Sequence, residues 1–342
     1  MLNDSATKLR KRLKTIGLSD PAIEAAWPIW WSDDADESSS ARAELRYSIA
    51  RKLGLDPHSL LEDDEAPRFV WREAARFKHL RGETYNERCA ISSFGTALGT
   101  ILLRATTLAS HIADKSPREL RDIILARQPY VRLVDLISLC WSVSIPTIHL
   151  RVFPGQRKRM AAMSVRVGDR NAILLGKDSS YPAQIAFYLA HELAHISLGH
   201  LANQTAIVDF EWHPDFNPDP PLPAPAPDRD ELRADAFALE ILTGEPEPIV
   251  LPLGGRGGAR SLAKAALGAA TELRIEPGTL ALCFGYSTGD WSTAIASLRY
   301  IYTSPKPVWR EINSIALQQL SLAELPDDAG LYLQKVLGET VA

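Results

Sequence analysis

The chain has 342 residues and a formal net charge of −4, with 46% hydrophobic and 23% charged residues, which is ordinary for a globular protein of two or three domains. That charge gives no overall attraction to nucleic acid or anionic membranes, and no apolar run approaches the ~20 residues that span a bilayer. The three cysteines are widely spaced and the N-terminus lacks a signal-peptide core, so we expect a cytoplasmic protein without a disulfide framework.

Residues 1–66 are predicted to form a domain of short helices. ARKLGLDPHSLL at 50–61 resembles the closing helices of phage-repressor helix-turn-helix domains. However, WWSDDADESS at 30–39 places acidic side chains where a recognition helix should lie, and these would repel phosphates. We interpret the basic run at 8–14 as a solvated helix face, and the tryptophans as packing residues or a partner-facing patch: Trp27, Trp30 and Trp31. A degenerate helix-turn-helix that contacts protein is therefore expected, with weak or absent DNA binding.

The next section, up to residue 140, is predicted to be helical. SPRE at 116–119 has the pattern of a capping box, in which a serine and a glutamate satisfy each other's backbone N–H groups. We expect this section to support a catalytic sheet. The predicted helices cover residues 69–80, 92–113, 116–128 and 131–141.

The segment IAFYLAHELAHISLG at 185–199 predicts a buried helix whose only charged or strongly polar side chains lie at its centre. Ser179 and Ser180 can cap this helix, and Pro182 suits its first turn.

His191 and His195 lie one helical turn apart, with Glu192 beside them. Two imidazoles and a carboxylate are costly to bury unless they are paired or bind a metal. Two histidines at i and i+4 place two ring nitrogens on one cation, with the glutamate as general base. His200 projects about 140° away from His195 on a continuous helix, so we expect it at the helix end or on the surface.

A second helix is predicted from DRDELRADAFALEILTG at 228–244, with Asp228 as its cap and Gly244 at its end. Glu231 is the candidate third metal ligand. Asp235, four residues later on the same face, would accept the free ring N–H of a ligand histidine. The alternative is an ordinary solvated acidic helix start.

HELAH at 191–195, followed by ELRADAFA at 231–238, resembles the ImmA/IrrE-type metallopeptidases, zincins that cleave helix-turn-helix repressors. The segments 139–154 and 163–177 are similar to that family's small sheet, and the resemblance covers about residues 139–248. It implies that the metal ligands are His191, His195 and Glu231 and that Glu192 is catalytic. The Pro-rich stretch at 212–228 departs from the family and is predicted to be an exposed loop.

The remainder, 249–342, is predicted to be helical and carries no chemistry motif. The glycines at 254–258 lack the Lys-Ser/Thr of a phosphate loop, so we interpret them as a flexible connection. No histidine follows His213, so this region offers none to stabilise a transition state.

The sequence thus predicts a mostly helical α+β protein, with a small zincin-like sheet and an HExxH helix between helical N- and C-terminal domains. The expected boundaries are 1–66, 67–248 for the metallopeptidase domain, and 249–342. The expected function is zinc-dependent hydrolysis of a regulatory protein, plausible substrates being helix-turn-helix repressors, in transcription regulation and stress response.

In the expected mechanism, Glu192 assists the attack of a zinc-bound water on the scissile carbonyl. Tyr188 is the candidate donor to the oxyanion, with Tyr181 and C-terminal residues as alternatives. Zinc suits a His₂Glu ligand set, although manganese stays open. The alternative function is a DNA-binding or antitoxin-like regulator whose metal is structural. Substrate, cleavage site, activating signal and oligomeric state do not follow from the sequence.

Overall fold

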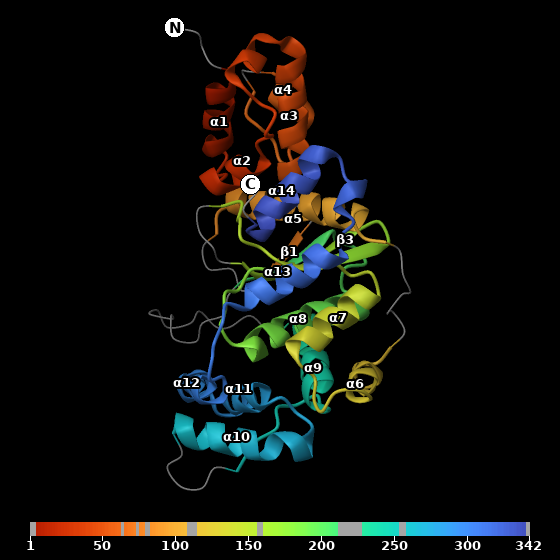
Figure 1. Cartoon of the computed structure of the whole chain (residues 1–342), viewed down its shortest axis with the longest axis vertical. Helices are drawn as coiled ribbons and strands as arrows, with labels where there is room; N and C mark the ends of the chain where they lie inside the picture. The colour runs from red at the N-terminus through yellow and green to blue at the C-terminus, as the bar shows by residue number, and fades with distance from the viewer. Residues whose placement is uncertain are drawn as a thin grey trace.

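The computed structural model describes residues 5–62, 65–72, 75–78, 83–107, 115–155, 160–210, 228–252 and 258–339. Over these residues the chain is α+β, with fourteen α-helices and a five-stranded mixed sheet, which confirms the predicted mostly helical class. The N-terminal helices lie at one end of an elongated molecule, the sheet lies in its middle, and α10–α12 lie at the other end (Figure 1). No helix in this described part is long and apolar enough to cross a membrane.

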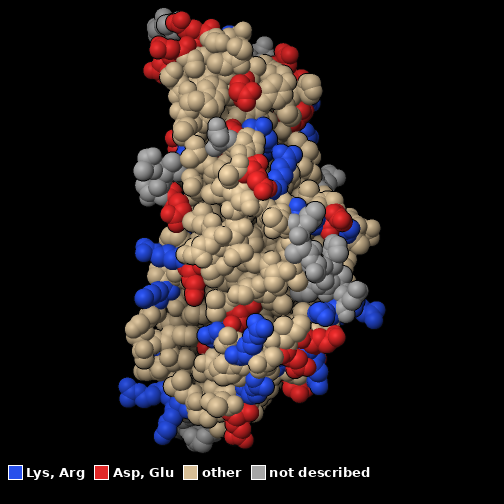
Figure 2. Space-filling model, turned by 45° about the vertical axis from the view of Figure 1, so that its right-hand side comes forward, with Lys and Arg blue, Asp and Glu red and all other residues tan. Residues whose placement is uncertain are grey.

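Helices form the N-terminal end, as predicted, but there are four of them, because Gly54 divides the segment predicted as one helix over residues 40–61. Serine and aspartate side chains cap three of them by accepting backbone N–H bonds, and Gly54 ends the longest with a φ of 70°. The acidic stretch forms only a short 3₁₀ turn, Asp33–Glu37, and Figure 2 shows acidic side chains gathered at this end of the molecule. The helices are α1 (Ser5–Thr15), α2 (Asp20–Ala26), α3 (Ser39–Leu53) and α4 (Pro57–Leu61).

The five strands have the order β1-β5-β3-β4-β2. The outer pairs, β1 with β5 and β2 with β4, are parallel, whereas β3 runs antiparallel to both of its neighbours. This sheet includes the segments expected to form one before the HELAH helix. The strands are β1 (Ala75–Lys78), β2 (Thr147–His149), β3 (Met160–Val167), β4 (Arg170–Leu175) and β5 (Ala206–Phe210).

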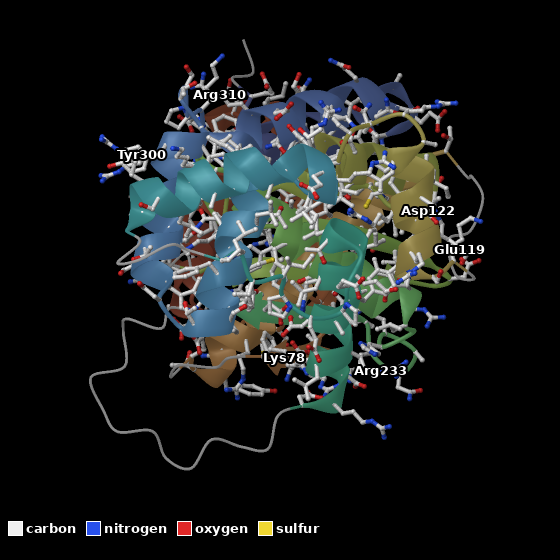
Figure 3. All side chains as sticks on the ribbon, turned by 90° about the horizontal axis from the view of Figure 1, so that it is seen from below. Lys78, Glu119, Asp122, Arg233, Tyr300 and Arg310 are labelled. Carbon is white, nitrogen blue, oxygen red and sulfur yellow. The ribbon has the colours of Figure 1, made fainter. Side chains whose placement is uncertain are left out.

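Strand β1 corrects the helix predicted over residues 69–80. Its four residues pair in register with β5, from Ala75 opposite Ala206 to Lys78 opposite Asp209. Pairing with a strand about 130 residues away in the chain therefore overrides the local helical pattern. Figure 3 shows Lys78, at the end of β1, beside helix α9.

The middle of the chain supplies five helices. Thr84 with Glu87, and Ser116 with Glu119, form complete capping boxes; the second was predicted. The cap predicted from Ser179 and Ser180 is wrong: α8 has Tyr181 at its N-cap without a side-chain bond, because the Ser179 hydroxyl binds Tyr181 N and Gln184 instead. The helices are α5 (Tyr85–Arg104), α6 (Pro117–Leu125), α7 (Leu133–Ser142), α8 (Pro182–Ser197) and α9 (Arg229–Thr243).

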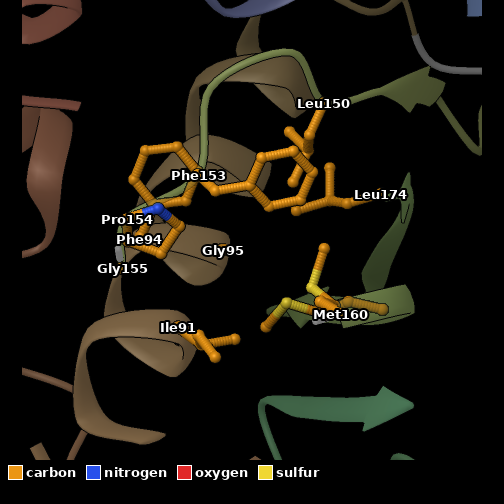
Figure 4. A pocket seen from close by; sticks show the side chains of 10 residues that line it. Ile91, Phe94, Gly95, Leu150, Phe153, Pro154, Gly155, Met160 and Leu174 are labelled. Carbon is orange, nitrogen blue, oxygen red and sulfur yellow. The ribbon is translucent and has the colours of Figure 1, made fainter. Parts of the chain in front are cut away.

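Helices α5 and α8 cover opposite faces of the sheet. Along β3, Ser164 contacts α8, whereas Met163 faces α5, as the two-residue period of a strand requires. A Cβ on Gly95 of α5 would lie 2.3 Å from the Met163 sulfur, so glycine permits the close approach of helix and sheet. A small apolar cavity lies at this interface, lined by Ile91, Phe94, Leu150, Phe153 and Met160 among others (Figure 4).

The C-terminal helices were predicted, and they pack in two places. Helices α10–α12 pack on one another, and α11 also contacts α8. Helix α13 instead packs beside β2, and α14 contacts α2 and α3, where Asp328 pairs with the buried Lys52. The helices are α10 (Ala259–Leu273), α11 (Pro277–Thr288), α12 (Trp291–Ile301), α13 (Val308–Gln319) and α14 (Asp327–Leu337).

Three predictions fall largely outside the described residues. They concern the Pro-rich loop at 212–228, described only at Asp228, the glycine-rich connection at 254–258, described only at Gly258, and His213.

Candidate metal centre

Helix α8 brings His191 and His195 to the place where it meets α9 and β5. Both histidines are buried, with 7% and 0% of their surface exposed. The neighbouring residues Ala190 and Ala194 are also fully buried, so α8 lies close against its surroundings. The helix is therefore buried nearly all round, and its histidines need polar partners.

Four side chains from three elements converge on one point. The Nε2 atoms of His191 and His195 lie 3.0 Å apart. Glu231 of α9 approaches them to 3.4 and 3.5 Å, and Asp209 Oδ2 of β5 lies 3.2 Å from His191 Nε2. All four ligand atoms lie within 4.8 Å of one another.

These separations match the coordination shell of zinc. A tetrahedron with zinc–ligand bonds of about 2.1 Å has edges of about 3.4 Å. The separations of His191 Nε2 from the other three groups, and of His195 Nε2 from Glu231, run from 3.0 to 3.5 Å, and all four ligand atoms lie within 4.8 Å. The four residues could therefore hold a metal ion.

The outward ring nitrogens of both histidines also have partners. Asp235 Oδ1 lies 2.9 Å from His191 Nδ1, the contact that the sequence predicted for this carboxylate. The partner of His195 Nδ1 is His200 Nδ1, at 2.8 Å. His200 was expected at the helix end or on the surface. It does follow the end of α8, but its side chain is buried, with 5% of its surface exposed.

Glu192 points between α8 and β3 and is fully buried. The Ser164 hydroxyl donates a hydrogen bond to Glu192 Oε2, whereas Oε1 has no hydrogen-bond partner. Burial and the nearby charge of Asp209 raise the pKa of Glu192 well above its usual value. An unpartnered oxygen on a fully buried carboxylate fits a bound water or ion.

The carboxylates of the site favour a bound cation. Burial lowers the pKa of His191, but its hydrogen bonds to carboxylates, that with Asp209 foremost, raise it well above the usual value. Burial raises the pKa of Glu231, but the hydrogen bonds with His191 and Lys78 lower it by more, so the net pKa is below its usual value. Lys78 Nζ lies 2.7 Å from Glu231 Oε1. Burial and the charge of His191 lower the pKa of His195 to about 4. His191 and Lys78 thus face the carboxylates whose charge a divalent ion would neutralise.

The predicted site residues do not all meet. His191, His195 and Glu231 converge with Glu192 and Asp235 close by, whereas Tyr188 is half-buried against the main core and is not part of the ligand group. Sequence reasoning missed Asp209, Lys78 and the contact of His200. The one available signal for Asp209 was an acidic residue inside the otherwise apolar strand AIVDF.

Comparisons with models of known protein families, with curated proteins and with solved structures found no match for this chain.

Proposed function

We propose that the chain is a zinc-dependent endopeptidase. One observation carries the proposal: two imidazoles and the Glu231 carboxylate converge with zinc-like separations beside a buried glutamate that follows the first histidine. Both imidazoles turn Nε2 to this point and bind another group through Nδ1, the arrangement typical of histidines that hold a metal. The resemblance of the HELAH and ELRADAFA motifs to those of ImmA/IrrE-type enzymes adds support.

Glu192 is the proposed general base and acid. A zinc ion held by His191, His195 and Glu231 would supply Lewis acidity toward a carbonyl and a water. Because Ser164 already binds Glu192 Oε2, the free Oε1 is the atom that accepts a proton and later returns it to the leaving amine. Burial of Glu192 favours this role, since a carboxylate of raised pKa gains and loses a proton more readily near neutral pH.

Tyr188 remains the proposed donor to the developing oxyanion. It lies on α8 one turn before His191 and is half-buried. The alternative donor, Tyr181, stacks on Tyr302 with ring centroids 5.8 Å apart, and this contact favours a structural role for Tyr181. A hydroxyl that serves as donor must approach the oxyanion to within about 3 Å when substrate binds.

The proposed substrate is a regulatory protein. We propose that the N-terminal helices contact this substrate or another protein. Internal contacts occupy much of their basic run: Arg10 lies over the Trp27 ring, and Arg12 donates to backbone carbonyls that include Ser59 O. Lys14 pairs with Asp20 at 2.6 Å. These contacts leave fewer cations for DNA phosphates, which favours protein binding over DNA binding.

Asp209 supports a second candidate function, a regulator with a structural metal. If Asp209 binds the ion together with the other three residues, four protein ligands close the site, as in structural zinc centres. Hydrolysis needs an open fourth position instead. The two candidates therefore make opposite predictions for Asp209.

The test uses zinc-loaded wild type, Glu192→Gln and Asp209→Asn, each incubated with a proteome-derived peptide library and with intact helix-turn-helix repressors. The peptidase proposal predicts specific cleavage by wild type and Asp209→Asn, and none by Glu192→Gln with full zinc content. If wild type holds zinc but cleaves nothing, and Asp209→Asn loses the zinc, the structural candidate replaces it. Cleavage retained by Glu192→Gln would contradict the mechanism.

A further inference from the structure

The end of α8 folds back on its own metal ligand. The helix ends at Ser197, and Gly199 adopts the left-handed conformation with a φ of 71°. As a result, the backbone N–H of His200 donates to the carbonyl of His195 at 3.0 Å. This turn brings the His200 side chain alongside His195, whereas a continuous helix would carry it away.

The two rings meet through their Nδ1 atoms, which lie 2.8 Å apart. One nitrogen must donate and the other accept. A histidine that binds a metal through Nε2 carries its proton on Nδ1, so His195 is the donor and His200 Nδ1 the acceptor. The proton of neutral His200 then lies on Nε2, which faces Asp230 Oδ1 at 3.7 Å.

We propose that His200 is a positioning residue for the metal ligand His195. It does for His195 what the Asp235 carboxylate does for His191: it accepts the outward N–H, fixes the tautomer and holds the ring so that Nε2 faces the ion. This inference rests on the proposed metal binding, but not on hydrolysis.

Two substitutions of His200, to side chains of nearly equal size, distinguish the effect of its hydrogen bond from the effect of its packing. In His200→Asn, the Oδ1 atom can take the place of the accepting Nδ1. His200→Leu puts a methyl group there and leaves the His195 N–H buried without a partner. His58, an exposed histidine on α4 at the N-terminal end of the molecule, provides the matched control His58→Leu.

The experiment measures zinc affinity by competition with a chromophoric chelator, using the full chain, after circular dichroism has verified the fold of each variant. We expect His200→Leu to bind zinc 10- to 100-fold more weakly, and His200→Asn and His58→Leu to stay within a few-fold of wild type. In zinc-loaded wild type, nitrogen NMR should show His195 protonated at Nδ1, and that proton should exchange faster with solvent in His200→Leu.

Each contrary result has a distinct meaning. Unchanged zinc affinity in His200→Leu overturns the positioning role but leaves the proposed function intact. Equal losses in His200→Leu and His200→Asn also overturn it, because packing alone would then explain both. A wild type that binds no zinc overturns this inference together with the proposed function, whereas zinc binding without any hydrolysis overturns the peptidase proposal alone.

Discussion

Zinc should stabilise the fold through Glu231, and the size of the effect follows from binding linkage. The proposed ligands lie on α8 and α9, far apart in the chain, so only the folded chain brings them together. An ion that binds only the folded state adds RT ln(1 + [Zn]/Kd), about 4.1 kcal/mol when free zinc is buffered at about 1,000 times the wild-type Kd.

At that same free zinc concentration, the variants should gain less. Asp235→Ala, which removes the partner of His191 Nδ1, should weaken binding about 10- to 100-fold and gain about 1.4 to 2.7 kcal/mol. Glu231→Ala removes a ligand that faces both histidine nitrogens, so it should lose more than 100-fold in affinity and gain less than about 1.4 kcal/mol.

Urea unfolding followed by circular dichroism, with buffered zinc and with chelator, gives this increment for each protein. Taking the difference within each variant cancels changes in metal-free stability, such as loss of the ion pair between Glu231 and Lys78. Glu240→Ala is the control, because Glu240 also lies on α9 but pairs with Arg118 instead, at 3.7 Å. A wild-type increment in Glu231→Ala would refute the ligand assignment.

Three further predictions concern other parts of the account. Glu192→Gln should keep wild-type zinc affinity and lose at least about 100-fold in hydrolysis, measured on any peptide the wild type cleaves; retained turnover would contradict its role as base. Fluorescence anisotropy at physiological salt should show only micromolar or weaker, sequence-independent DNA binding, whereas nanomolar binding to one site, lost on deleting residues 1–66, would make the chain a DNA-binding regulator. Asp328→Ala should lower the free energy of unfolding by about 3 kcal/mol, because it leaves buried Lys52 without its carboxylate; a loss below about 1 kcal/mol would contradict this packing. Burial raises the pKa of Asp328, but Ser48 and Lys52 lower it by more, so its net pKa is below the usual value. The contribution of Asp328 to the free energy of unfolding is therefore present above about pH 4 and is lost as pH falls through the folded-state pKa.

Local signals explain what could be predicted from the sequence. Apolar periodicity and Pro182 predicted α8, and the Asp228 cap and Gly244 predicted both ends of α9. Once these two helices were expected, helical spacing alone placed His191 and His195 on one face and Glu231 with Asp235 on another. The close approach of those two faces is the part that the family resemblance suggested.

The features that were missed depend on distant parts of the chain or on a helix end. Lys78 reaches the site because β1 pairs with β5, and nothing local to residues 69–80 indicates a strand. Asp209 faces the histidines because β5 lies beneath α8, a fact of tertiary packing. The position expected for His200 assumed a continuous helix, but the left-handed Gly199 turns the chain back one residue earlier.

The most direct test of the central claim is zinc K-edge X-ray absorption on the purified full-length chain, with metal content measured on the same sample. The account predicts one zinc per chain, with two imidazole nitrogens and carboxylate oxygens at about 2.0 to 2.2 Å and no sulfur ligand. His191→Ala should lose most of this metal. A chain that binds no divalent metal, or a zinc bound by sulfur at about 2.3 Å, would contradict the account.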